Sequence, residues 1–227
     1  MNWDGTCIGN ITEYIIDEID GNTNQIVSLD YKGIIQKVHL KKINREYPYI
    51  SLIEDELKPY FGIFKIGKHS CYITYNNRES MYIVSKYYEN SVKLSDYILK
   101  NKITDKSVLY SIKKCFIFKL LCGFCTNYNS KLLVIKIGDV ILITTSGNDK
   151  LNFGNDSFNG SVIPNTAINN WFKSWKEVYN MIFELFGNDE LHTLINGIDN
   201  IINRIDRNSI LIKSQILSRI ESYLYKI

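Results

Sequence analysis

The sequence SIKKCFIFKLLCGFC (111–125), followed by TNYNSK (126–131) and LLVIKIGDVILITTSG (132–147), decides how this chain is expected to fold. Apolar residues recur at helical spacing from residue 105 to 125, which predicts a heavily buried helix. Thr104 or Asp105 is its expected amino-terminal cap. The six polar residues that follow predict a turn, and the two short apolar runs predict a tight β-hairpin with Asp139 in its turn.

The part of the chain before this stretch has β-type patterns, and we expect a mostly antiparallel sheet there with one helix. The expected strands cover residues 11–19, 25–31, 34–43, 60–67, 70–76 and 80–88. Turn residues separate them at 32–33, 67–69 and 76–78. Residues 49–57 predict a short helix that ends before Pro59, because a residue preceding proline is biased away from the helical region.

The part after residue 90 is expected to be mainly helical. Besides 105–125, the expected helices cover residues 94–101, 166–186, 190–204 and 209–225, with a long loop after the hairpin. A sheet-rich front and a helix-rich back predict an α+β chain with a β-rich lobe over 1–90 and a helical lobe over 91–227. We expect the two lobes to form one compact unit with a hinge at 86–94.

The composition is that of an ordinary globular protein, with 227 residues of which 45% are hydrophobic and 22% charged. The net charge is only +3, and Lys and Arg are spread over the whole chain, so no nucleic-acid partner is expected. No apolar run of about 18 residues lacks a charge, and the start of the chain does not resemble a secretory signal. We therefore expect no membrane span and an intracellular, cytoplasmic location.

Two further compositional features bear on chemistry and origin. Five cysteines in mostly apolar surroundings are typical of reduced core thiols. Cys122 and Cys125 form a C-x-x-C pair, but it closes a helix and lacks two further zinc ligands, so we expect no metal site. Abundant Asn, Ile, Lys and Tyr with only 3 Pro is typical of an AT-rich genome, such as that of a large DNA virus or a protist.

The order of these elements resembles the atypical kinase fold shared by the phosphatidylinositol lipid kinases and the HipA-type kinases. MYIVSKYYEN (81–90) resembles the strand that runs into the hinge, and LSDYI (94–98) resembles the helix just beyond it. The helix over 105–125 resembles the central helix of the large lobe, which ends at the catalytic loop. The resemblance covers most of the chain and implies a bilobal kinase-like fold.

Kinase chemistry needs a catalytic-loop Asp, a metal-binding Asn a few residues later, and a second metal-binding Asp after the hairpin. The resemblance places these positions near Thr126, near Ser130 or Lys131, and near Thr144. None of these residues can do the family's work, and Asp139 is better explained as a turn residue. Using Asn127 or Asn129 instead recovers at most one weak metal ligand.

A kinase also grips the nucleotide phosphates with a small-lobe Lys that pairs with a Glu on the following helix. Lys37, Lys41 and Lys42 are the possible lysines, and Glu54 or Glu56 the possible partners. The alternative is that these lysines are solvated charges on an edge strand. The candidate nucleotide-cleft positions are therefore Lys37, Lys41, Glu54, Thr126, Lys131 and Thr144.

The sequence therefore predicts a pseudokinase that acts by binding a protein or ligand and uses no cofactor. Two alternatives remain open: an active atypical protein or lipid phosphotransferase that uses ATP and magnesium, and a structural or interaction protein unrelated to kinases. Trp171 and Trp175 lie in an aromatic-rich helix and are candidate interface residues, since Trp and Tyr favour interfaces. A protein partner is expected, and the oligomeric state is left open.

Overall fold

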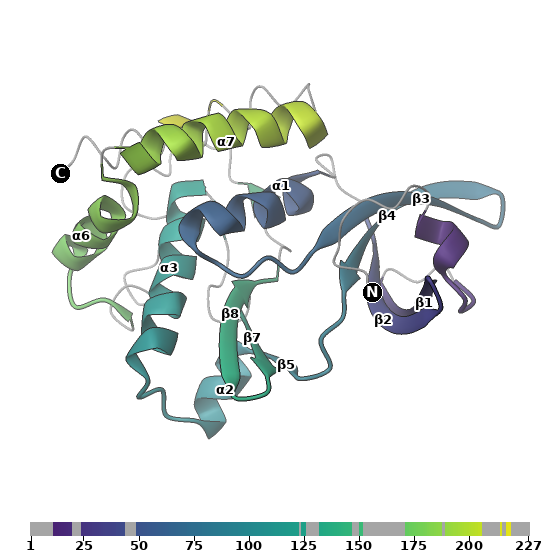
Figure 1. Ribbon diagram of the computed structural model, residues 1–227, viewed down its shortest axis with the longest axis horizontal. Helices are drawn as coiled ribbons and strands as arrows, with labels where there is room; N and C mark the ends of the chain where they lie inside the picture. The colour runs from purple at the N-terminus through teal and green to yellow at the C-terminus, as the bar shows by residue number, and fades with distance from the viewer. Residues whose placement is uncertain are drawn as a thin grey trace. The chain divides into compact units, whose positions relative to one another are not determined.

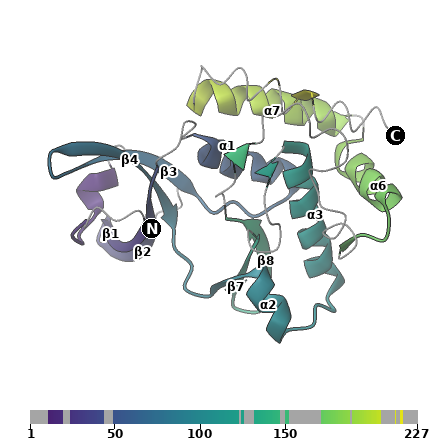
Figure 2. The ribbon, with the colours of Figure 1, turned by 180° about the vertical axis from the view of Figure 1, so that it is seen from behind.

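The structure is a computed structural model that divides into two compact units. It describes residues 11–19, 24–43, 49–122, 124–125, 132–146, 150–151, 171–187, 189–205, 214 and 217–218. Unit 1 consists of Met1–Asp55 and Ile66–Glu89, and unit 2 of Glu56–Lys65 and Asn90–Ile227. Figures 1 and 2 show the elements from two opposite sides. Antiparallel sheets and helices together make this an α+β chain, as the sequence predicts.

Unit 1 contains a four-stranded antiparallel sheet in the order β1-β2-β4-β3. Its strands are β1 (Asn24–Tyr31), β2 (Ile34–Lys42), β3 (Lys68–Tyr75) and β4 (Arg78–Lys86). Both hairpins turn on two residues with positive φ: Lys32 and Gly33 at 55° and 77°, and Asn76 and Asn77 at 50° and 59°. Two such residues match the twist of the flanking strands, which explains why glycine and asparagine identified these turns from sequence.

One face of this sheet carries the core of unit 1. The buried side chains are Val27, Leu29, Val38, Leu40, Cys71, Ile73, Tyr82 and Val84. The short 3-10 helix η1 (Ile11–Tyr14) supplies Tyr14, whose ring lies 5.8 Å from that of Tyr31, edge to face. The predicted strand over 11–19 is wrong, since these residues form η1 and a single bridge from Ile15 to Leu29.

Helix α1 (Ile50–Leu57) lies where the sequence predicts it, but the chain does not then form a strand. It continues as the 3-10 helix η2 (Lys58–Phe61), with proline in its first turn, where a missing N–H is tolerated. Gly62 ends η2 with φ at +59°, which favours glycine. The predicted strand over 60–67 is therefore wrong, and so is the turn at 67–69, because β3 already begins at Lys68.

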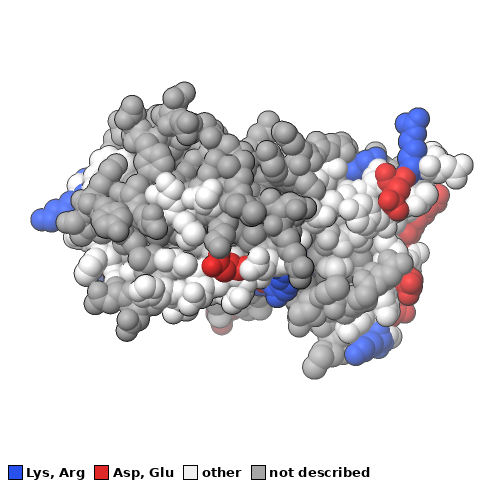
Figure 3. Space-filling view, turned by 90° about the horizontal axis from the view of Figure 1, so that it is seen from above, with Lys and Arg blue, Asp and Glu red and all other residues white. Residues whose placement is uncertain are grey.

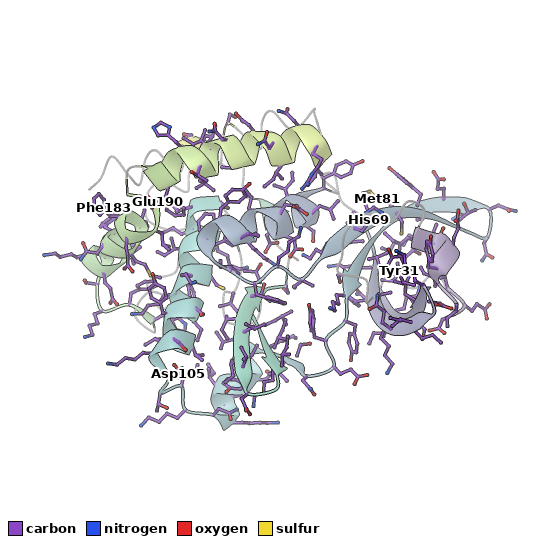
Figure 4. All side chains as sticks on the ribbon, viewed as in Figure 1. Tyr31, His69, Met81, Asp105, Phe183 and Glu190 are labelled. Atoms are coloured by element: carbon purple, nitrogen blue, oxygen red, sulfur yellow. The ribbon has the colours of Figure 1, made fainter. Side chains whose placement is uncertain are left out.

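Unit 2 is built around the buried helix α3 (Lys106–Cys122). Its cap is Asp105, which lies at the amino-terminal end of α3 in Figure 4 and accepts a 2.7 Å hydrogen bond from the Ser107 backbone N–H. Phe61 of η2 lies between α3 and α6, with its ring 4.9 Å from both Phe118 and Phe186. The predicted helix is too long at its end, because residues 124–125 form the short strand β6 instead.

The remaining elements of unit 2 are helices and two small antiparallel sheets. The helices are α2 (Leu94–Lys100), α6 (Trp175–Phe186) and α7 (Asp189–Ile205). The strands are β5 (Ser91–Lys93), β7 (Leu132–Ile137) and β8 (Val140–Thr145) in the order β5-β7-β8, and β6 (Phe124–Cys125) paired with β9 (Lys150–Leu151). The predicted hairpin is confirmed. The predicted helix over 166–186 begins too early, because residues 172–174 are not helical and Ser174 caps α6. Residues 166–170 and most of 209–225, where helices were also predicted, lie outside the described residues.

Figure 3 shows Lys and Arg side chains mixed with Asp and Glu on the face that it draws. Among the described residues, no helix combines the length and the apolar character that a membrane span requires.

Candidate functional site

The candidate site residues divide between the two units. Lys37, Lys41 and Glu54 belong to unit 1, and Thr144, Trp171 and Trp175 to unit 2. Thr126 and Lys131 lie outside the described residues.

In unit 1, the lysines of β2 differ in their surroundings. Lys37 and Lys41 lie on one face of β2, because alternate residues of a strand share a face. The Lys37 ammonium lies 3.2 Å from the Glu89 carboxylate, and both side chains are more than half exposed. Such a surface ion pair contributes at most about 1 kcal/mol. Lys41 lies further along the strand, is half-buried, and pairs with Ile83 of β4.

Two further basic residues, His39 and Lys68, lie on this face and form a row with Lys41. Neither was predicted as a site residue. His39 of β2 lies opposite Ser85 of β4, which in turn lies opposite Lys68 of β3. Lys68 is buried, and its ammonium donates a 2.9 Å hydrogen bond to the Ser51 hydroxyl of α1. Burial lowers the pKa of His39, and the nearby charges of Lys41 and Lys68 lower it further. Burial and the two nearby ammonium groups therefore favour the neutral form of the His39 imidazole.

Two acids of α1 are buried, and one of them binds the backbone of the chain that follows. Glu54 and Asp55 are no more than 1% exposed. The Asp55 carboxylate accepts hydrogen bonds from the backbone N–H groups of Ile66 at 3.1 Å and Gly67 at 2.9 Å. It also acts on Tyr88, whose pKa is raised first by burial and then by the Asp55 charge. Asp55 thus fixes where the chain enters β3.

Glu56, the other possible partner for a β2 lysine, binds elsewhere. It belongs to unit 2, where its carboxylate lies 2.5 Å from the Lys65 ammonium and 2.6 Å from the Arg204 guanidinium. Lys37 therefore pairs with Glu89, and Glu56 pairs with Lys65 and Arg204.

In unit 2, the carboxyl end of β8 is held by the segment that follows α1. Thr144 is fully buried, and its hydroxyl donates a 2.6 Å hydrogen bond to the Phe64 carbonyl. The Lys58 ammonium, also fully buried, donates a 2.9 Å hydrogen bond to the Thr145 carbonyl. Lys58 lies 87 residues before Thr145, so nothing local in the sequence predicts this contact.

Few acidic residues occur in the described part of this hairpin. Within 132–146 the sequence has one acid, Asp139, which lies exposed in the turn between β7 and β8. Over the part of the chain that the structure describes, no three His, Cys, Asp or Glu side chains gather into a group that could hold a metal ion.

The candidate interface residues lie among other aromatic rings. The Trp171 ring is 6.2 Å from that of Phe116 on α3, and the Trp175 ring is 5.9 Å from that of Tyr179 on α6. Both indoles are half-buried. Phe183, one turn after Tyr179, is 56% exposed on the surface of α6 (Figure 4).

The described thiols are buried. Cys71, Cys115 and Cys122 form no disulfide, and burial raises the pKa of Cys71 to about 12. The Cys115 thiol donates a weak hydrogen bond of 3.8 Å to the Ile143 carbonyl. Cys122 ends α3, where the helix dipole disfavours a thiolate.

Comparison with known proteins gives distant structural matches. No family model and no curated protein matches this sequence. A solved structure of the Helicobacter pylori proinflammatory kinase CtkA matches with a TM-score of 0.45 and 14% identity, over 94% of each chain. The Drosophila melanogaster PAN3 pseudokinase matches with a TM-score of 0.32 and 10% identity, over 88% of this chain and 63% of that one.

Proposed function

We propose that this chain is a catalytically degenerate kinase-like protein that acts by binding a protein or ligand, without phosphoryl transfer. The order of its elements supports a kinase-like fold. Along the chain, α1 comes between β2 and β3 of the four-stranded antiparallel sheet, and the buried helix α3 precedes the hairpin of β7 and β8.

The carboxyl end of β8 is the observation that carries this proposal. A kinase has a metal-binding Asp after the corresponding hairpin. Here the residue is Thr144, a neutral side chain whose hydroxyl proton is donated to the Phe64 carbonyl. The adjacent carbonyl of Thr145 accepts from the buried ammonium of Lys58. The polar groups at this strand end thus serve the fold, and a lysine brings a positive charge to a place where a kinase binds metal cations.

The basic row of unit 1 is consistent with the same proposal. In kinases the small-lobe Lys pairs with a Glu of the helix and holds the phosphates. The ammonium of Lys68 on β3 donates a hydrogen bond to the Ser51 hydroxyl of α1. This bond fastens the helix to the sheet, a structural role that does not require a nucleotide.

The test uses the purified full chain with ATP, with and without magnesium. We expect no phosphate transfer above the protein-free blank and no magnesium-dependent rise in melting temperature, since only a ligand that binds the folded state raises it. Thr144→Ala and the exposed-site control Thr74→Ala should both stay at the blank. Phosphotransfer by the wild type that Thr144→Ala abolishes and Thr74→Ala preserves would contradict the proposal.

The aromatic residues of α6 favour a protein as the bound partner. Trp175, Tyr179 and Phe183 recur every four residues, so they follow one side of the helix. Aromatic side chains are enriched at protein interfaces. We expect Phe183→Asp and Trp175→Gln to abolish self-association or capture of a partner, while Asn180→Asp on the exposed face leaves it unchanged. A monomer that binds no protein, or binding that survives both aromatic substitutions, would refute this assignment.

A further inference from the structure

The segment Glu56–Lys65, here named the linking segment, holds the carboxyl end of β8 from one side. Lys58 donates to the Thr145 carbonyl at 2.9 Å, and the Phe64 carbonyl accepts from the Thr144 hydroxyl at 2.6 Å. Lys58 and Thr144 are fully buried, so neither bond is replaced by water when it breaks. The position of these two threonines therefore depends on where the linking segment lies.

Helix α7 contacts the same segment at two points. A Cβ atom at Gly197 would lie 2.3 Å from the nearest ring carbon of Tyr60, so a larger residue there would require the partly exposed Tyr60 side chain to move. Seven residues later, two turns along the helix, the Arg204 guanidinium lies 2.6 Å from the Glu56 carboxylate. The contacts of α7 thus fall on the first half of the linking segment.

The linking segment is poorly able to absorb a displacement within itself. Phe61 at its centre is 1% exposed and packs edge to face against Phe118 and Phe186, both at 4.9 Å. The Lys114 ammonium also binds the Gly62 carbonyl at 2.8 Å. Close-packed interiors transmit strain, so a shift of the backbone at Tyr60 or Glu56 is passed through the buried Phe61 to the atoms that hold β8.

We propose that α7 controls how firmly the carboxyl end of β8 is held, acting through the linking segment. Release of α7 would loosen Thr144 and Thr145, and a ligand that fixes α7 in place would tighten them. The coupling is a property of these contacts; its use in regulating a binding site at β8 rests on the function proposed above.

Hydrogen exchange measured by mass spectrometry tests the coupling on the full chain. Arg204→Ala removes an exposed ion pair, and Gly197→Ala introduces the clash with Tyr60. Asn203→Ala, on the exposed face of α7, is the matched control. We expect exchange of the amides in 141–146 to rise about two- to fivefold in Arg204→Ala. It should rise more in Gly197→Ala and stay unchanged in Asn203→Ala.

The comparison of regions decides the outcome. Faster exchange in 141–146 and 58–64, with residues 24–31 of unit 1 unchanged, would support the coupling. It would be overturned by Arg204→Ala changing α7 alone, or changing every region equally. A second check uses Thr144→Val, which removes one of the two bonds, so that in its background Arg204→Ala should have a smaller effect on 141–146. None of these readouts involves a nucleotide, so failure here is distinct from failure of the proposed function.

Discussion

Replacing Asp55 by Asn should destabilise unit 1 strongly although the two side chains have nearly the same shape. The Asp55 carboxylate is 1% exposed and accepts from the backbone N–H groups of Ile66 and Gly67 at 3.1 and 2.9 Å. A hydrogen bond to a charged group contributes about 1.5 to 3 kcal/mol. The amide of Asn retains one acceptor oxygen and directs an NH2 group at the other N–H. We therefore expect Asp55→Asn to lower the free energy of unfolding by about 2 to 4 kcal/mol.

Urea denaturation measures this loss, and Asp30→Asn provides the matched control. Asp30 also accepts a backbone N–H bond, from Gly33 at 3.0 Å, but this bond is exposed at the end of β1, so Asp30→Asn should lose less than about 1 kcal/mol. With a urea m-value of about 2 kcal/mol/M, Asp55→Asn should lower the midpoint by about 1 to 2 M. Equal midpoint shifts in the two variants would refute the assignment of Asp55 as the group that holds the entry into β3.

Three further outcomes are expected. Lys58→Met should lower the free energy of unfolding by about 1.5 to 3 kcal/mol, because it removes a buried, charged donor from the Thr145 carbonyl. Urea denaturation measures this loss, and a value below about 0.5 kcal/mol, roughly the least that a hydrogen bond contributes, would contradict the prediction. Burial lowers the pKa values of His39 and His69, so the unfolded chain binds more protons below about pH 6.5, and the free energy of unfolding should fall as the pH drops through that range. Replacing both histidines by Gln should flatten this dependence, and an unchanged slope would refute it. The Cys71 thiol, with its pKa raised to about 12, should react with a thiol reagent at pH 8 only on unfolding, so rapid labelling of the native chain at that residue would be the contrary result.

The parts of the fold that the sequence predicts well depend on neighbouring residues. The hairpins were identifiable because two-residue turns need positive φ, which Gly33 and the asparagines at 76 and 77 adopt readily. The buried helix α3 was identifiable because its cap and its apolar period both lie within it. These features required no knowledge of distant contacts.

The parts that it predicts poorly depend on distant residues. Residues 60–67 have the apolar pattern of a strand, but Asp55 binds the backbone at 66 and 67, and Thr144 of β8 binds the carbonyl of residue 64. Lys68 was assigned to a turn because Gly67 precedes it, and its role is visible only once Ser51 is brought beside it. Pattern alone cannot reveal a partner that the fold supplies.

The side chains that bind the backbone of β8 also affect whether the chain aggregates during folding. β8 has the sequence VILITT, with no charge and a strong β preference, and it is an edge strand of its sheet. Such an edge can template pairing with another chain. Two carbonyls on one edge, those of Ile143 and Thr145, are occupied by Cys115 and Lys58.

We expect the bond from Lys58 to form after the hairpin of β7 and β8, because the hairpin needs only local contacts whereas Lys58 and Thr145 are 87 residues apart. Until the Lys58 bond forms, the edge of β8 can pair with another chain. We expect a variant that lacks Lys58 to aggregate during refolding at concentrations where the wild type stays clear.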